Sequence, residues 1–159
     1  MIGETKGHLG ASLYAREILG LEGEALGPPP PVDLAVEQRN ADFVRSLIEQ
    51  GLVNAVHDVS DGGIACAVAE MALASGQGWS QAPEFGGIEM FAEDQHRYLI
   101  AITSPHDIHK LSREAGIHST NAGSLYDDGT AMLAGIEFPL SKLREAHEGW
   151  LPTYMSKVD

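Results

Sequence analysis

The pattern most informative about the fold lies at residues 52–75, LVNAVHDVSDGGIACAVAEMALAS. The stretch opens with a short, apolar and β-branched run at 52–56, which is typical of a buried strand. A polar turn with two glycines follows. The chain restarts at Ile64 as an alanine-rich run that ends before Gly76, which predicts a helix packed closely on a sheet. A strand, a glycine-containing turn and a helix in succession indicate an α/β arrangement.

The turn at residues 57–63, HDVSDGG, has a composition suited to binding phosphate. Gly62 and Gly63 allow the backbone to approach a ligand and to adopt left-handed angles. The start of the following helix directs free N–H groups at an anion. Ser60, Gly62 and Gly63 are therefore candidate phosphate-binding residues. The alternative is that the glycines only form the turn, while Asp58 or Ser60 caps the helix.

Two carboxylates in the same turn predict a metal site. Asp58 and Asp61 offer hard oxygen ligands, which suit Mg²⁺ that bridges to phosphate. His57, at the end of the strand, has two interpretations: a structural residue held by hydrogen bonds, or a group that contacts ligand as an acid or base. Both stay open, and His57 is the candidate for a catalytic residue.

Helical and strand patterns alternate along the rest of the chain. Asp33 can cap a helix that ends at Gly51 and carries its apolar side chains on one face. Residues 97–103 predict a strand, and Ser104 the start of a helix through Ala115. We also expect a short helix at 11–19, a loop at 77–87, strands at 117–126 and 130–133 joined as a hairpin by the turn 127–129, and a last helix at 142–148. The order predicts an α/β (α+β) fold, a mixed β-sheet flanked by helices.

The chain divides into an opening segment, residues 1–31, and one domain, residues 32–159. Six glycines punctuate the opening segment, and it ends in four prolines, which form a stiff extended strap. So irregular an opening leads us to expect that the sequence is part of a longer polypeptide. Lys6, Gly7 and His8 are candidates for a loop that contacts phosphate or a neighbouring domain; the alternative is a plain interdomain linker.

Composition excludes several classes of protein. The 159 residues include 10 lysines and arginines against 23 aspartates and glutamates, a formal charge of −13. Such a charge repels nucleic acid and anionic membrane surfaces, so neither is an expected partner. The single cysteine, Cys66, allows no internal disulfide, and no apolar run approaches the roughly 20 residues of a membrane-spanning helix. We therefore expect a cytoplasmic protein.

Several motifs together resemble one known family. The 57–63 turn with its strand is followed by AEMA at 69–72. The supporting motifs are TKGHLG at 5–10 with Ser12, PPVDL at 30–34, Phe91-x-Glu93, Arg97-Tyr98 and LREAHE at 143–148. In this order they resemble the C-terminal part of the large subunit of phosphoribosylformylglycinamidine synthases, in the aminoimidazole ribonucleotide synthetase superfamily. The Ser60-Asp61 pair resembles the second of the two C-terminal-type domains in such a subunit.

The resemblance implies an ATP-dependent C–N ligase of purine biosynthesis. Formylglycinamide ribonucleotide, ATP and glutamine-derived ammonia would give formylglycinamidine ribonucleotide, ADP and phosphate. It also implies Mg²⁺ and ATP or ADP as cofactors, Asp58 as a metal ligand, and a mixed sheet with ferredoxin-like aspects. The implied partners are the rest of the large subunit, a glutaminase subunit or domain, and a small accessory subunit. This chain alone is expected to be inactive.

A non-catalytic role is the alternative. The domain would then be a structural module that holds an auxiliary Mg-ADP and interdomain contacts, and Asp61 fits a specialised site of this kind. Another enzyme of the superfamily, such as aminoimidazole ribonucleotide synthetase or selenophosphate synthetase, is disfavoured, because the resemblance implies that their matching loops lack the motif at 57–63.

Overall fold

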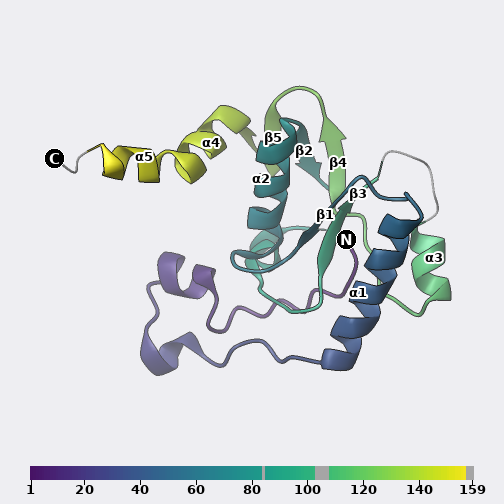
Figure 1. Cartoon of the computed structure of the whole chain (residues 1–159). Helices are drawn as coiled ribbons and strands as arrows, with labels where there is room; N and C mark the ends of the chain where they lie inside the picture. Colours follow the sequence, from purple (N-terminus) through teal and green to yellow (C-terminus); the bar gives the residue numbers. More distant parts are fainter. Residues whose placement is uncertain (84, 103–107, 157–159) are drawn as a thin grey trace.

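The computed structural model describes residues 1–83, 85–102 and 108–156 (Figure 1). The helices are the short η1 (Tyr14–Ile18), η2 (Gly23–Leu26) and η3 (Gly87–Phe91) and the α-helices α1 (Leu34–Glu49), α2 (Gly63–Ser75), α3 (Ile108–Glu114), α4 (Leu140–Glu148) and α5 (Trp150–Met155). The strands are β1 (Ala55–Asp58), β2 (Gly78–Gln81), β3 (Tyr98–Ala101), β4 (Gly123–Tyr126), β5 (Thr130–Leu133) and β6 (Ile136–Pro139).

The strands form two sheets in the described part of the chain. β1 and β3 pair antiparallel, and Ile2 extends this sheet through bridges to Tyr98 and Ser119. The second sheet has the order β4-β2-β5-β6, in which β2 and β5 are parallel and the other pairs antiparallel. The prediction of an α/β fold with a mixed sheet and flanking helices is confirmed.

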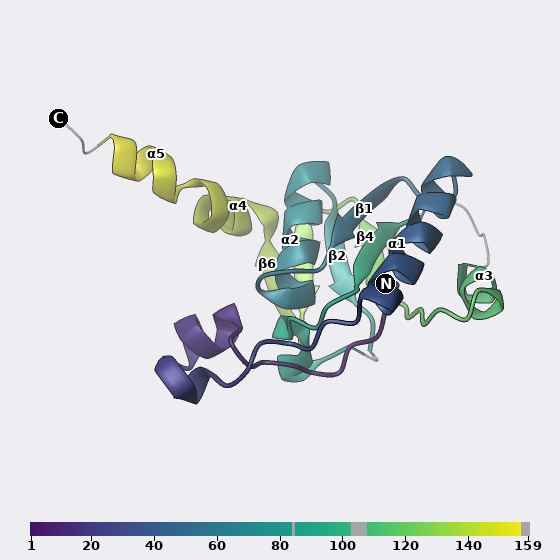
Figure 2. The same cartoon turned by 60° about the horizontal axis from the view of Figure 1, so that its bottom comes forward.

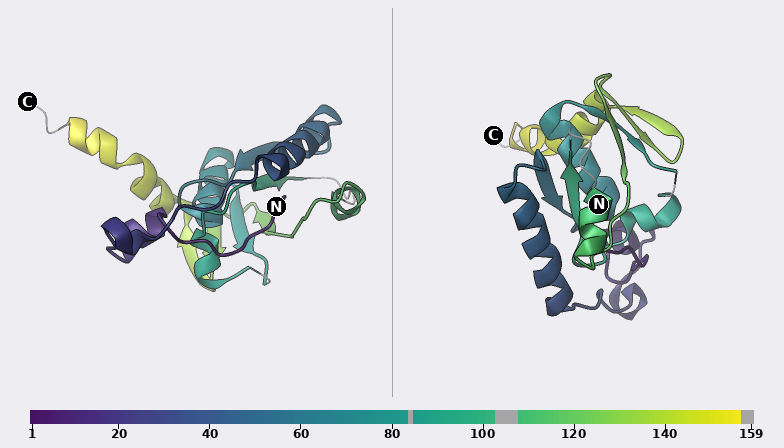
Figure 3. Two further views of the ribbon diagram at one scale, coloured as in Figure 1. Left: turned by 90° about the horizontal axis from the view of Figure 1, so that it is seen from below. Right: turned by 90° about the vertical axis from the view of Figure 1, so that its right-hand side faces the viewer.

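Helix α1 begins and ends as the sequence predicts. The Asp33 carboxylate accepts hydrogen bonds from the N–H groups of Ala35 and Val36 at 3.0 and 3.1 Å, which satisfies two donors at the start of the helix. One face of α1 buries Val44 and Leu47. This face packs on the sheet of β1 and β3, beside which α1 lies in Figure 3.

Helix α2 lies in the main core, because its small side chains allow neighbouring elements to approach closely. Ile64 and Val68 are buried together with Trp79 of β2, Met90 of η3 and Leu99 of β3. The helix therefore contacts both sheets and η3. Since α2 starts directly after the 57–63 turn, this packing fixes the place of the turn on the body of the domain.

The predicted hairpin around residues 127–129 is wrong. β2 lies between β4 and β5, pairing antiparallel with the first and parallel with the second. The true hairpin joins β5 to β6 through Ala134 and Gly135, which both have positive φ, 51° and 75°. The loop predicted at 77–87 is wrong at residues 78–81, which form β2, and at Gly87, where η3 begins. Strand β6 and helix α5 were not predicted.

Other boundaries differ by a few residues. The first strand is Ala55–Asp58 rather than 52–56, and the strand predicted at 117–126 is reduced to β4 with a bridge at Ser119. The helix predicted at 11–19 is one π-helical turn, η1. The helix predicted to start at Ser104 is described from Ile108, and its cap lies outside the described residues.

The part of the opening segment that contains η1 and η2 extends from the body on the same side of the molecule as the last two helices (Figures 1 and 2). α4 packs on α2 and β6, and the Arg144 guanidinium donates to the Leu73 carbonyl at 2.7 Å. α5 carries Trp150 and Tyr154, which are exposed and stack on each other. Within the described ranges, no helix has the length and apolar character needed to cross a membrane.

Candidate functional site

The turn at residues 57–63, here called the glycine turn, presents its carboxylates to solvent. Asp58 ends β1, and its side chain is 74% exposed. Ser60 and Asp61 are exposed as well, and the Ser60 carbonyl accepts from the Gly63 N–H at 3.0 Å. Gly62 is the N-cap of α2, and neither the Asp58 nor the Ser60 side chain makes a capping hydrogen bond in the described part of the chain. The alternative in which Asp58 or Ser60 caps α2 through its side chain is therefore wrong.

Gly62 and Gly63 are buried, and the packing of this chain requires both to be glycine. Gly62 has φ 75°, and a Cβ atom there would lie 2.2 Å from the Cys66 sulfur. Gly63 has φ 68°, and its Cβ would lie 2.5 Å from the Ala92 carbonyl oxygen and 2.7 Å from that of Met90. Other residues would be strained at such angles and would also clash. The two glycines thus let α2 start close against the chain that follows η3.

A carboxylate of the same chain faces the start of α2. Glu93 is half-buried, and its Oε1 accepts the N–H of Gly62 at 2.8 Å. The same oxygen accepts the N–H of Leu13 at 2.8 Å. A negative group is favoured at a helix N-terminus, where the sequence predicts phosphate. Glu93 therefore satisfies the Gly62 N–H that was expected to face a ligand.

The candidate residues near the N-terminus have a similar arrangement, within a segment called here the N-terminal loop, residues 4–13. Asp94, buried, accepts the N–H groups of Lys6 and Gly7 at 3.0 Å each through Oδ2, and that of His8 lies 3.4 Å away. His8 Nε2 donates to the Pro28 carbonyl at 3.0 Å, which ties the loop to the proline strap. The backbone N–H groups of this loop therefore bind a carboxylate of the chain itself.

The Lys6 side chain is exposed to solvent, whereas its backbone N–H is bound by Asp94. The side chain is 71% exposed, and its Nζ lies 3.5 Å from a carboxylate oxygen of Glu4. An exposed ion pair of this kind contributes little to stability. The Lys6 ammonium is thus accessible, and its prediction as a phosphate contact stays a prediction.

Arg97 is the buried cation beside both carboxylates. The residue is 1% exposed, and its guanidinium donates to the carbonyls of Asp94 and Ala92 at 2.8 and 2.6 Å, and to the Thr5 hydroxyl at 3.1 Å. Burial lowers the pKa of Arg97, while the charges of Asp94 and Glu93 act in the opposite direction. Residues 92–97, here called the support segment, therefore hold the glycine turn and the N-terminal loop together.

His57 is fixed by two acceptors. Its Nε2 lies 2.8 Å from a carboxylate oxygen of Glu70 on α2, and its Nδ1 lies 2.5 Å from the Asp58 carbonyl oxygen. The pair stands on the wall of a groove of about 590 Å³ between β1 and α2. Glu70 thus has the partner that a carboxylate in an apolar helix needs. These contacts support the structural interpretation of His57, and a ligand contact stays a prediction.

Negative charge collects around the first turns of α2. Burial raises the pKa of the Cys66 thiol, and the nearby charges of Glu70, Glu93 and Asp61 raise it further. The field near the glycine turn therefore repels a bare phosphate. A divalent cation would reverse the sign of the local charge.

The donor set at the glycine turn fits magnesium only in part. In the described ranges, no group of three or more histidine, cysteine, aspartate or glutamate side chains could hold a metal ion. Asp58 and Asp61 are both exposed to solvent. Magnesium usually binds through one or two carboxylates, keeping its other positions for water and phosphate oxygens. The pair suits that mode of binding, and does not suit a cage made by this chain alone.

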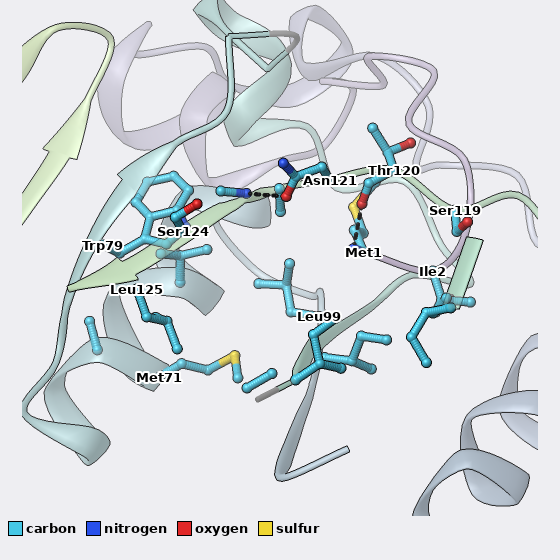
Figure 4. A pocket seen from close by; sticks show the side chains of 18 of the residues that line it. Met1, Ile2, Met71, Trp79, Leu99, Ser119, Thr120, Asn121, Ser124 and Leu125 are labelled. Carbon is cyan, nitrogen blue, oxygen red and sulfur yellow. Dashed lines mark hydrogen bonds between the residues drawn. The ribbon is translucent and has the colours of Figure 1, made fainter. Parts of the chain in front are cut away.

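A second hollow, of about 500 Å³, lies between the two sheets (Figure 4). Trp79, Leu99 and Leu125 give it apolar walls, and residues 119–121 line another side. No candidate residue from the sequence analysis lies on its wall. Because its lining comes from many separate elements, no local motif in the sequence indicates it.

Sequence analysis missed the roles of Glu93, Asp94 and Arg97, although it noted Phe91-x-Glu93 and Arg97-Tyr98 as motifs. The hydrogen bonds of Glu93 and Asp94 join residues 31 to 88 positions apart, so no local pattern predicts them. The available signal was two acidic residues followed closely by an arginine, between an apolar run and a buried strand.

The fold and the glycine turn define a member of a known domain family. A family model described as "AIR synthase related protein, C-terminal domain" matches residues 1–133, and the chain belongs to this family.

The chain is also similar to individual proteins over nearly its whole length. The chain is 47% identical over 159 residues to the phosphoribosylformylglycinamidine synthase subunit PurL of Caulobacter vibrioides, and 47% identical over 163 residues to that of Parvibaculum lavamentivorans. The alignments cover 98% of this chain but only 21% and 22% of the two relatives. The chain therefore spans about a fifth of the length of these relatives.

Solved structures agree on the fold. PurL of Thermotoga maritima complexed with FGAR superimposes with a TM-score of 0.67 at 19% identity, over 89% of this chain and 26% of that one. The structure of PurLQS from the same organism gives a TM-score of 0.61 at 18% identity, over 76% of this chain and 23% of that one. This likeness establishes the architecture.

Proposed function

We propose that this chain is the second C-terminal-type domain of the large subunit of a phosphoribosylformylglycinamidine synthase. The whole subunit would convert formylglycinamide ribonucleotide, ATP and ammonia to formylglycinamidine ribonucleotide, ADP and phosphate. The observation that carries the proposal is the 47% identity to the Caulobacter vibrioides subunit PurL over 98% of this chain. The family membership of residues 1–133 supports it.

Asp58 and Asp61 would hold Mg²⁺ that is joined to the phosphates of ATP or ADP. Their side chains lie on the exposed face of the glycine turn, where a nucleotide from an adjoining domain can reach them. A bridging metal would offset the repulsion between phosphate and a chain of charge −13. In this proposal, the exposed Ser60 side chain contacts phosphate in addition to the metal.

The remaining candidates act by shaping the site. Gly7, His8 and Gly62 have their backbone N–H groups directed at Asp94 or Glu93, and Gly63 packs on the support segment. In our proposal they position the exposed residues, with Lys6 as an added cation at the edge. Phosphate is then held by the metal and by side chains.

A glutaminase subunit or domain would supply ammonia, and a small accessory subunit would complete the assembly, in the cytoplasm. The PurLQS structure of Thermotoga maritima, similar in fold, supports an assembly of this kind. Because this chain spans about a fifth of its relatives, it would be inactive without the rest of the large subunit.

A second candidate function is a scaffold that keeps an auxiliary Mg-ADP without turnover. The observation that favours it is the engagement of His57, the candidate acid or base of the turn, by Glu70 and the Asp58 carbonyl. The turn presents exposed carboxylates, while its histidine is engaged by acceptors of the chain itself. Such an arrangement suits retention of a metal better than proton transfer.

A chimera tests the proposal. This chain would replace the matching segment of the Caulobacter vibrioides subunit, and amidine formation would be measured with ammonium chloride as the nitrogen source. We expect activity comparable to the parent enzyme. A folded chimera without activity would contradict the proposed function. The chimera with Asp58→Asn separates the two candidates: loss of turnover indicates a catalytic site, and loss of bound ADP with unchanged turnover per folded molecule indicates the scaffold.

A further inference from the structure

Glu93 joins two segments that are far apart in the sequence. One carboxylate oxygen accepts the N–H of Gly62 in the glycine turn and the N–H of Leu13 in the N-terminal loop, both at 2.8 Å. The backbone N–H of Glu93 donates to the His8 carbonyl at 3.0 Å. A single half-buried residue thus makes three hydrogen bonds across the junction of the two loops.

The glycine turn has little other freedom. Gly63 packs on the carbonyls of Met90 and Ala92, so the turn cannot move inward. Glu93 holds the Gly62 N–H, so the turn is also held against moving outward. Asp61 precedes Gly62 directly in the chain. The place of Asp61 therefore depends on the bond between Gly62 and Glu93, whereas Asp58 is held by the pairing of β1 with β3.

We propose that Glu93 is a positioning residue that sets the place of Asp61 for Mg-nucleotide, and that it acts as a hydrogen-bond acceptor. This inference rests on the proposed function. Glu93 is not a metal ligand in this account, because its Oε1 is directed at two N–H groups inside the junction. Hydrogen bonds to a carboxylate are strong, and losing the acceptor leaves two donors unsatisfied.

Two substitutions separate an acceptor from a charge. Glu93→Gln keeps an oxygen that can accept both N–H bonds but removes the negative charge. Glu93→Met keeps the length of the side chain but removes the acceptor. Glu89→Met is the matched control, since Glu89 is exposed on the neighbouring η3 and accepts no hydrogen bond through its carboxylate among those of the described residues.

Binding of Mg-ADP to the chimera described above is the functional measurement. Titration calorimetry with and without Asp58→Asn identifies the binding component that this domain supplies. We expect Glu93→Met to weaken that component by about tenfold or more, and Glu93→Gln and Glu89→Met to change it by less than about threefold. A merely structural role would lower the melting temperature without this difference between the two substitutions at 93.

Amide hydrogen exchange in the 159-residue chain is the local measurement. Glu93→Met should accelerate exchange at Gly62 and Leu13 together, while Lys6 and Gly7, which donate to Asp94, keep their protection. Glu93→Gln should leave all four unchanged. This result is independent of any activity of the protein.

The outcomes are distinct. Equal damage from Glu93→Gln and Glu93→Met would overturn the inference, because the charge would then matter rather than the acceptor. Unchanged Mg-ADP binding in Glu93→Met would overturn it as well. If Glu93→Met does not fold, Glu93→Gln provides the test by itself. A tenfold loss of its affinity for Mg-ADP, about 1.4 kcal/mol, would contradict the inference. A chimera without any binding that depends on Asp58 would refute the proposed metal site itself, and the inference with it, whereas the other failures leave that site intact.

Discussion

The two faces of the glycine turn, residues 57–63, differ in what they contact. On the inner face, Gly62 is buried against Cys66 and Gly63 against the carbonyls of Met90 and Ala92, and Glu93 accepts the Gly62 N–H. On the outer face, Asp58 and Asp61 are exposed. The glycines of a motif typical of phosphate binding therefore serve the packing of the domain, and the carboxylates that precede them are exposed to solvent. Changes of the two glycines on the inner face should alter stability, and changes of the carboxylates on the outer face should alter binding.

Gly63→Ala should have the largest effect on stability. The new Cβ would meet two carbonyl oxygens at 2.5 and 2.7 Å, at a φ of 68° that alanine adopts at a cost. Strain and overpacking together predict a loss of about 4 kcal/mol in the free energy of unfolding, measured by urea denaturation. Gly76→Ala is the matched control: Gly76 has φ 72° with no atom within 4 Å of the added Cβ, and should lose about 1 kcal/mol. Equal losses would show that close packing is not the reason for Gly63.

Arg97→Met should have the next largest effect. The substitution removes a buried guanidinium that donates to two carbonyls and to Thr5, and it leaves Glu93 and Asp94 without their neighbouring cation. We expect a loss of about 3 kcal/mol in the same measurement. Arg39→Met, on the exposed surface of α1, should change stability by less than about 0.5 kcal/mol. If Arg97→Met lost as little free energy of unfolding as Arg39→Met, the support segment would not depend on Arg97.

Tyr98→Phe should have a smaller effect that depends on pH. Burial, and then the hydrogen bond and charge of Glu37, raise the pKa of Tyr98 from its ordinary value of 10.0 to about 12. The fold therefore favours the neutral phenol. Its contribution is complete below about pH 10 and is lost as the pH rises to about 12. Urea denaturation at stepped pH should show a shallower alkaline decline in Tyr98→Phe; identical declines would contradict the pKa shift.

The sequence predicted those parts of the fold whose signals are local. The cap at Asp33, the apolar face of α1 and the end of α2 at Gly76 are set by neighbours in the chain, and the structure has all three. The hairpin at 127–129 failed because a local turn signal does not say which strand pairs with which. β2 enters between β4 and β5, where Gly78 allows the close approach of Thr130.

The candidate site also has a part that the sequence predicted and a part that it did not. Residue types at 57–63 correctly placed the turn between a strand and a helix, because glycine and acidic residues have local preferences. The acceptors of the turn could not be predicted, because Glu93 and Asp94 reach Gly62, Leu13 and Lys6 only after the domain has folded. A motif that suggests a ligand does not reveal whether the protein itself supplies the partner.

The outer face should give the smallest change in stability and a large change in binding, and one measurement tests this directly. In the chimera with the Caulobacter vibrioides subunit, Asp58→Asn and the parent would be compared for Mg-ADP affinity by calorimetry and for free energy of unfolding. Since Asp58 is 74% exposed, we predict a stability change below about 0.5 kcal/mol. Affinity for the Mg-ADP bound by this domain should fall by about tenfold or more. Unchanged affinity would contradict the assignment of the outer face to metal and nucleotide.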